Sequence, residues 1–133
     1  MPLRREIINP KNDHLNVSRN FKIPHSPGVR AGDFIYLSGM VSVDPATGER
    51  SLGTVAHETR QILSNMAHML ESAGSSMERV VKINVLLYSM LEFENMNAVY
   101  RQFFQKDPPA RTTCGVQLSG GLKVEIECIA LAG

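Results

Sequence analysis

An arginine and a pair of glutamates near the end of the chain have the types and spacing to bind a carboxylate and move a proton. Arg111 follows two prolines, and its planar guanidinium can hold a carboxylate through two parallel hydrogen bonds. Glu125 and Glu127 lie two positions apart in a strand-like run, so both carboxylates share one face and either could act as a general acid or base. Taken alone, such residues more often form a surface salt bridge and a solvated face, and the sequence does not rank the two glutamates.

The other reactive residues form no pattern typical of a metal or nucleophile site. The four histidines, at positions 14, 25, 57 and 68, lack a spacing such as His-x-x-x-His, so no metal is predicted. There is no glycine-rich phosphate loop and no Gly-x-Ser-x-Gly elbow. Cys128 alternates with the glutamates and is expected to be buried, and Cys114 belongs to no motif. Both cysteines are interpreted as small packing residues.

Length and charge limit the function classes. A chain of 133 residues suits a single domain, taken as 1–133. A net charge of +1 argues against nucleic acid and against a polybasic membrane anchor. The first residues lack the apolar run of a signal peptide, and no stretch reaches membrane-spanning length. With only two cysteines, a disulfide framework is not indicated, and a cytoplasmic location is expected.

Periodicity predicts the elements that must position these residues. The first thirty residues look irregular because prolines interrupt them. Apolar runs predict strands at 34–43, 81–87, 111–118 and 124–130. The turn at 44–48 is expected to fold the chain back as a hairpin, which adds a second strand after 34–43, and 119–121 form another turn. Amphipathic helices are predicted from Thr54 to Gly74, and from Ser89, which opens a capping box, to the prolines before Arg111. The predicted order is β-β-α-β-α-β-β, an α+β fold with both helices on one face of a single sheet.

The other face of this predicted sheet is also partly apolar. Phe34, Tyr36, Leu86 and Ile129 alternate with the residues expected to face the helices. A short monomeric chain would expose these side chains to water. The pattern therefore favours burial of the second face in an oligomer.

Two segments, PPARTTCGV at 108–116 and KVEIECIA at 123–130, closely resemble the C-terminal signature of the RidA (YjgF) family. The resemblance covers roughly Ile23 to Ala132, and its ordered set of matches is very specific. The upstream matches are Gly32-Asp33, Tyr36 to Gly39, the turn 44–48, Gln61, Asn65, Ala73-Gly74, Phe93, Asn97, Tyr100 and Phe104.

This resemblance implies a chorismate-mutase-like α+β fold, a homotrimer with ligand sites in the clefts between subunits, and no cofactor. Members of the enzymatic branch hydrolyse reactive imines such as 2-iminopropanoate and 2-iminobutanoate. The expected activity is therefore hydrolytic deamination of a small 2-imino or enamine acid to a 2-keto acid and ammonia. An anchored carboxylate and one positioned water suffice for such a reaction, because the imine is already reactive.

Residue by residue, Arg111 matches the arginine that binds the substrate carboxylate, and Glu125 matches the glutamate that positions or activates water. Ser38 and Gly39 match residues that line the pocket, and Asn97 matches an asparagine of the second helix near the cleft.

The sequence departs from the family pattern at three places. His25 stands where the imine-hydrolysing branch has a tyrosine, either as an exposed loop residue or as a polar replacement for the phenol. Thr113 occupies the usual cysteine position, which leaves Cys114 pointing to the opposite face. Ser119-Gly120-Gly121 replaces the usual Leu-Pro.

Two other function classes remain open at this point. One is a non-enzymatic trimer of the same family that binds small acids or acts like a chaperone. The other is a chorismate mutase, which would share the fold but should place several cations around a dicarboxylate, whereas only Arg111 can be assigned here.

Overall fold

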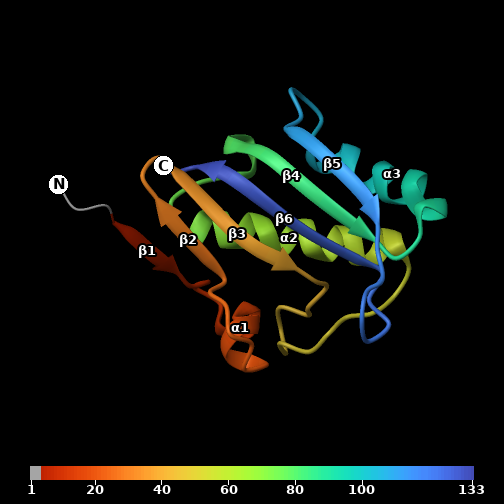
Figure 1. Ribbon diagram of the computed structural model, residues 1–133, viewed down its shortest axis with the longest axis horizontal. Coiled ribbons are helices and arrows are strands. Elements are labelled where there is room, and N and C mark those ends of the chain that lie inside the picture. Colours follow the sequence, from red (N-terminus) through yellow and green to blue (C-terminus); the bar gives the residue numbers. More distant parts are fainter. Residues whose placement is uncertain (1–3) are drawn as a thin grey trace.

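The computed structural model describes residues 4–133 and shows one six-stranded sheet whose two long helices cover a single face (Figure 1). The strands are β1 (Arg5–Ile8), β2 (Gly28–Ala31), β3 (Phe34–Met40), β4 (Val80–Leu87), β5 (Ala110–Gly115) and β6 (Val124–Leu131). The helices are α1 (Val17–Asn20), α2 (Val55–Ser72) and α3 (Phe93–Phe103), with 3-10 turns η1 (Asp13–Leu15), η2 (Met77–Arg79) and η3 (Met90–Glu92). The sheet order is β1-β2-β3-β6-β4-β5, antiparallel except for the β4–β5 pair.

The α+β class and the placement of both long helices on one face are confirmed, but the predicted order of strands is wrong at its start. Two strands, β1 and β2, lie within the segment that was expected to be irregular, and β2 forms a hairpin with β3 around Gly32, whose φ is +61°. The observed order is β-β-β-α-β-α-β-β. Strands of four residues show too little alternation to be recognised. Pairing stabilises them instead, because β2 pairs with β3 and β1 pairs with β2.

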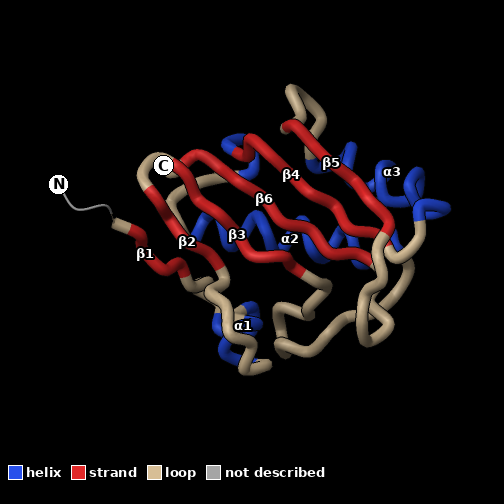
Figure 2. The backbone as a smooth tube through the Cα atoms, viewed as in Figure 1, coloured by secondary structure: helices blue, strands red, loops and turns tan. Residues whose placement is uncertain are grey.

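The turn at 44–48 forms, but it does not join two full strands. The Gly48 amide donates to the Asp44 carbonyl at 2.8 Å, and Gly48 has a φ of +82°. Strand β3 has already ended at Met40, and only a single bridge between Val43 and Arg50 follows. The chain therefore crosses from β3 to α2 in a long loop, which is drawn in tan in Figure 2.

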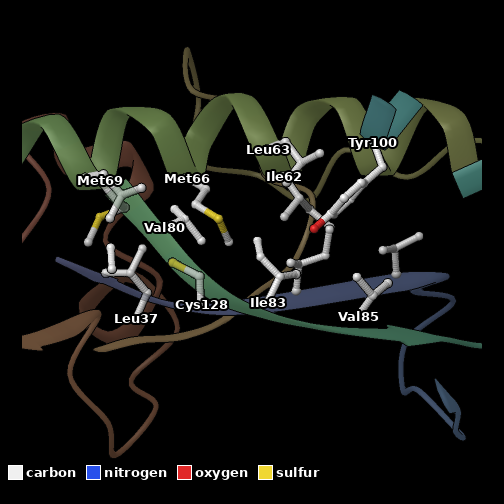
Figure 3. Close-up of a cluster of buried hydrophobic side chains, with 14 of the residues drawn as sticks. Leu37, Ile62, Leu63, Met66, Met69, Val80, Ile83, Val85, Tyr100 and Cys128 are labelled. Carbon is white, nitrogen blue, oxygen red and sulfur yellow. The ribbon is translucent and has the colours of Figure 1, made fainter. Parts of the chain in front are cut away.

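Helix α2 begins and ends where its sequence signals predict. The Thr54 hydroxyl accepts a hydrogen bond from the His57 amide at 3.1 Å, and Gly74, with a φ of +78°, follows the last turn. Met66 and Met69 are buried, as expected for the apolar face of the predicted amphipathic helix. Figure 3 shows them between α2 and the sheet, opposite Leu37 and Cys128.

Helix α3 begins later than predicted. The Ser89 hydroxyl accepts from the Leu91 amide at 3.2 Å, but this contact caps the 3-10 turn η3, and α3 starts at Phe93. The Glu92 carboxylate accepts from the Asn95 side chain at 2.6 Å instead of closing the expected capping box. On α3, Met96, Val99 and Tyr100 are buried, and Met96 and Tyr100 belong to the core between the helices and the sheet.

The face of the sheet opposite the helices carries exposed apolar side chains. Phe34 and Tyr36 keep 39% and 44% of their surface exposed, and Leu131, the partner of Phe34 in β6, keeps 39%. Leu86 and Ile129 are half-buried on the same face. The prediction that both faces of the sheet are partly apolar is confirmed. Within residues 4–133, none of the helices is long and apolar enough to cross a membrane.

Candidate active site

Glu125 lies against the backbone of Gly39 on the open face of the sheet. Gly39 lies near the end of β3, where the register with β6 shifts between Leu37 and Met40. The Glu125 carboxylate approaches Gly39 so closely that a Cβ at this position would overlap it. A glycine is therefore required here to leave room for the carboxylate, and the predicted pocket residues Gly39 and Glu125 are brought together.

The surroundings of Glu125 favour its protonated form. Partial burial raises the pKa of this carboxyl above its ordinary value, and the negative charge of Glu127 raises it further. The charge of His25 acts in the opposite direction and by a smaller amount. Both glutamates share one face of β6, as predicted, but Glu127 is exposed. A carboxylate with a raised pKa can accept a proton from water more readily than an ordinary one.

His25 and Gly39 both line a small cavity. The cavity measures about 30 Å³ and is lined by His25, Ser38 and Gly39 together with apolar residues of α1, β3 and α2. The imidazole is exposed, and its Nδ1 atom lies 2.6 Å from the hydroxyl oxygen of Ser18. His25 is thus a surface residue by exposure and a neighbour of the predicted pocket residues by position.

Ser38 holds the segment that carries His25. Its hydroxyl donates to the carbonyl of Ser26 at 2.6 Å, and its amide donates to the carbonyl of Pro27 at 3.0 Å. These two bonds attach the residues after His25 to β3. The Ser38 hydroxyl is therefore already used as a donor within the protein.

Arg111 occupies a different place, on the helix side of the edge strand β5. Its Nη1 atom donates to the Asn97 side-chain oxygen at 2.8 Å, so these two predicted residues are brought together. The guanidinium carbon lies 4.7 Å from the ring centroid of Tyr100 and 5.5 Å from that of Phe93. Within residues 4–133, Arg111 forms no ion pair with a carboxylate. The guanidinium is therefore held in place and still able to bind an anion.

Arg111 and Glu125 point to opposite faces of the sheet. Arg111 pairs with Ile83 of β4, which pairs with Cys128 of β6, and both partners are buried under the helices. Glu125 pairs with Leu86, which belongs to the other alternating set of β4. Strand β4 separates β5 from β6, so the two backbones are about 10 Å apart. The residues predicted to share one site form two separate groups in the single chain.

The sequence matches a known protein family over most of its length. The sequence profile of the family described as Endoribonuclease L-PSP matches residues 19–132. The chain belongs to this family, also called RidA or YjgF.

Individual relatives extend the match over most of the chain. A RutC family protein of Pyrococcus horikoshii is 40% identical over 108 residues, which are 80% of this chain and 86% of that protein. The human 2-iminobutanoate/2-iminopropanoate deaminase is 39% identical over 111 residues, 83% of this chain and 81% of the enzyme. Among solved structures, Escherichia coli TdcF with bound serine is 33% identical, with a TM-score of 0.76 over 83% of this chain and 89% of that one.

The positions where this RidA-family chain departs from the expected pattern are well defined in the structure. Thr113 shares the face of Arg111, and its hydroxyl is buried without a hydrogen-bond partner among residues 4–133. Cys114 is exposed on the opposite face, as predicted, and Cys128 is buried. Burial and the charge of Glu127 raise the pKa of the Cys128 thiol to about 12, so this thiol stays protonated at neutral pH. Gly120 and Gly121 both have positive φ values and form the predicted turn.

Sequence reasoning missed three residues that shape the two groups. Phe93 and Tyr100 were named only as matches to the family, but their rings flank the guanidinium of Arg111. Ser18 was missed because the single turn of α1 was not recognised. An available signal was Asn16, whose side chain caps α1 by accepting from the Arg19 amide at 3.1 Å. Among residues 4–133, no three His, Cys, Asp or Glu residues group as metal ligands would.

Proposed function

We propose that this protein hydrolyses small 2-imino or enamine acids to 2-keto acids and ammonia, with no cofactor. The proposal rests on two side chains whose surroundings suit this reaction. Arg111 is oriented by Asn97 and has no carboxylate partner within residues 4–133. Glu125 is half-buried and packs on Gly39. Relatives about 40% identical are named imine deaminases, and a related structure holds serine, a small amino acid with a carboxylate.

We further propose that the complete site forms between two copies of the chain in a homotrimer. One small molecule cannot touch both Arg111 and Glu125 of a single chain, because they lie on opposite faces of the sheet. A neighbouring copy that covers the apolar open face, around Phe34 and Tyr36, would bring its own Arg111 to the Glu125 of the first copy. The free cysteines agree with the expected cytoplasmic location, where thiols remain reduced.

The chemistry assigns a separate task to each group. Arg111 binds the substrate carboxylate through its remaining N–H groups and fixes the imine carbon. Glu125 accepts a proton from a water molecule as the water oxygen bonds to that carbon. The imine nitrogen gains protons, the carbon–nitrogen bond breaks, and ammonia and the keto acid leave. Ser38 and Gly39 shape the wall beside Glu125, and Asn97 orients Arg111.

A direct assay with an unstable imine tests the proposal. An amino-acid oxidase produces 2-iminopropanoate from alanine, semicarbazide traps the imine that remains, and the rate of trapping reports its survival. Wild-type protein should reduce trapping at catalytic concentration, whereas Arg111→Ala and Glu125→Gln should not. Glu127→Gln is the matched control, because its side chain is exposed on the same strand.

Two results would contradict the proposal. Wild-type protein that leaves the imine untouched but binds pyruvate would be a small-acid-binding protein and not a deaminase. A mass near 14.7 kDa by light scattering at micromolar concentration would rule out the homotrimer and with it the shared site.

A further inference from the structure

A short loop brings Ser18 and His25 together by two separate contacts. The Ile23 amide donates to the Ser18 carbonyl at 2.9 Å, which closes the loop between them. The Ser18 hydroxyl oxygen then lies 2.6 Å from Nδ1 of His25, a short and well-formed hydrogen bond. Asn16 caps α1, the helix that carries Ser18, by accepting a hydrogen bond from the Arg19 amide. The imidazole is thus oriented by bonds that the loop itself determines.

The other ring nitrogen of His25, Nε2, is available to exchange a proton with a ligand. Within residues 4–133, Nε2 of His25 has no hydrogen-bond partner, and Nδ1 is occupied by Ser18. Both residues line the cavity that Ser38 and Gly39 also line, and Gly39 is the residue on which the Glu125 carboxylate packs. A hydroxyl that holds one imidazole nitrogen determines which nitrogen can exchange a proton elsewhere.

Other charged groups near the imidazole are few. Asp13 and Arg19 line the hollow on the outer side of His25, and they form an ion pair of 3.6 Å with each other. On the inner side, Glu125 is the charged group whose field His25 affects, with Glu127 beyond it on the same strand. The imidazole therefore shares one hollow with a paired set of charges and interacts electrostatically with the proposed base.

We propose that Ser18 is a positioning residue for His25 and that His25, through Nε2, supplies the proton to the substrate nitrogen while Glu125 takes one from water. This assignment rests on the proposed function and adds to it a group that replaces the phenol expected at this position. It also makes α1, a helix of one turn, part of the site.

Proton transfers balance over the two halves of the reaction. In the first half, the water oxygen bonds to the imine carbon, Glu125 takes a water proton, and the His25 imidazolium gives its proton to the nitrogen. The product is a carbinolamine, with neutral His25 and protonated Glu125. In the second half, Glu125 returns its proton to the nitrogen, His25 takes the hydroxyl proton, and ammonia leaves as the carbonyl forms. Both side chains end in the states in which they began.

Kinetics of paired substitutions test the role of Ser18. Ser18→Ala should lower kcat about fivefold, the effect of losing one hydrogen bond, without changing the Kd for pyruvate. Ser18→Thr keeps the hydroxyl and should restore most of the activity. His25→Ala should lower kcat about a hundredfold. Ser51→Ala is the matched control, because Ser51 makes a similar bond of 2.8 Å to His57 outside the cavity.

Nitrogen NMR of the histidine rings provides a readout that does not depend on turnover. In wild-type protein, pyruvate should shift the Nε2 signal of His25, and Ser18→Ala should change the balance of its two neutral tautomers. If Ser18→Ala alters neither kcat nor the tautomer balance, or if Ser18→Thr does not recover what Ser18→Ala loses, the positioning role is wrong while deamination still stands. If wild-type protein shows the NMR effects but no deamination, the positioning of His25 by Ser18 stands, while the proposed function and the proton transfer assigned to His25 both fall.

Discussion

Asn97 and Arg111 are joined by a hydrogen bond of 2.8 Å between the amide oxygen of the helix residue and Nη1 of the strand residue. Asn97 is 7% exposed, so this bond is largely shielded from water. It uses one of the five N–H donors of the guanidinium. Nη1 also donates to the sulfur of Met96 at 3.9 Å, and the remaining N–H groups are left for a ligand. A neutral partner can orient the arginine without neutralising its charge, which a carboxylate at the same place would do.

Substitution of Asn97 should therefore separate orientation from charge. Asn97→Ala removes the hydrogen bond and should weaken pyruvate binding about threefold to tenfold. Asn97→Asp is nearly isosteric but supplies a competing anion, so binding should fall by more than tenfold. Calorimetric titration with pyruvate measures both changes. An Asn97→Asp variant that binds pyruvate as tightly as wild type would show that Arg111 does not hold the carboxylate.

The two parallel hydrogen bonds that the Arg111 guanidinium can form should matter for binding as well as its charge. Arg111→Lys keeps a positive charge, but a lysine ammonium cannot form two parallel hydrogen bonds or stack on the Tyr100 ring in the same way. Pyruvate binding should fall by at least tenfold, as expected when a charge-assisted bond worth about 1.5–3 kcal/mol is lost. If Arg111→Lys binds pyruvate as tightly as wild type, only the positive charge of Arg111 matters for binding.

Activity should depend on pH through the Glu125 carboxyl. This group must be ionised to accept a proton from water, and its raised pKa means that kcat/KM is lost, as pH falls, at a higher pH than for an ordinary glutamate. Glu127→Gln removes a charge that raises this pKa, so the acidic limb should move to lower pH with little loss of maximal rate. Glu125→Gln should lower kcat by roughly a hundredfold at every pH. A pH–rate profile of the three proteins tests the assignment, and an unmoved limb in Glu127→Gln would contradict it.

Gly39→Ala should damage the site more than the fold. The added Cβ would overlap the Glu125 carboxylate, which must then turn away from the position where it can reach water. Because Gly39 is exposed, the melting temperature should change little while kcat falls at least tenfold. Gly32→Ala provides a comparison, because its Cβ meets no atom within 4 Å and only its positive φ is strained. A fully active Gly39→Ala protein would place the reacting water elsewhere.

The cysteines should not be required for catalysis. Cys114→Ala removes an exposed thiol on the face opposite Arg111 and should leave kcat within about twofold. Cys128→Ala opens a small gap in the core, so it should lower the free energy of unfolding by about 1 kcal/mol with kcat preserved. Denaturant unfolding and the imine assay measure the two effects. Loss of activity in a folded Cys114→Ala protein would assign that thiol a chemical role.

Features that depend on near neighbours in the chain follow from the sequence alone. Helix α2 lies between Thr54 and Gly74 because a hydroxyl cap and a left-handed glycine act within one turn of the chain. The shared face of Glu125 and Glu127 and the burial of Cys128 follow from the period of two in any strand. The family resemblance added the identities of the candidate residues, because it compares ordered motifs over nearly the whole chain.

Which of these residues lie close together in space depends on the tertiary structure. Arg111 and Glu125 are fourteen positions apart in sequence, yet the insertion of β4 between their strands and the opposite phases of their alternation separate them. Ser18 contacts His25 because a loop closes between them. That closure depends on the hydrogen bond from the Ile23 amide to the Ser18 carbonyl, which no sequence motif predicts. Strand order, register and loop closure depend on contacts distant in sequence, so they are determined only when the whole chain packs.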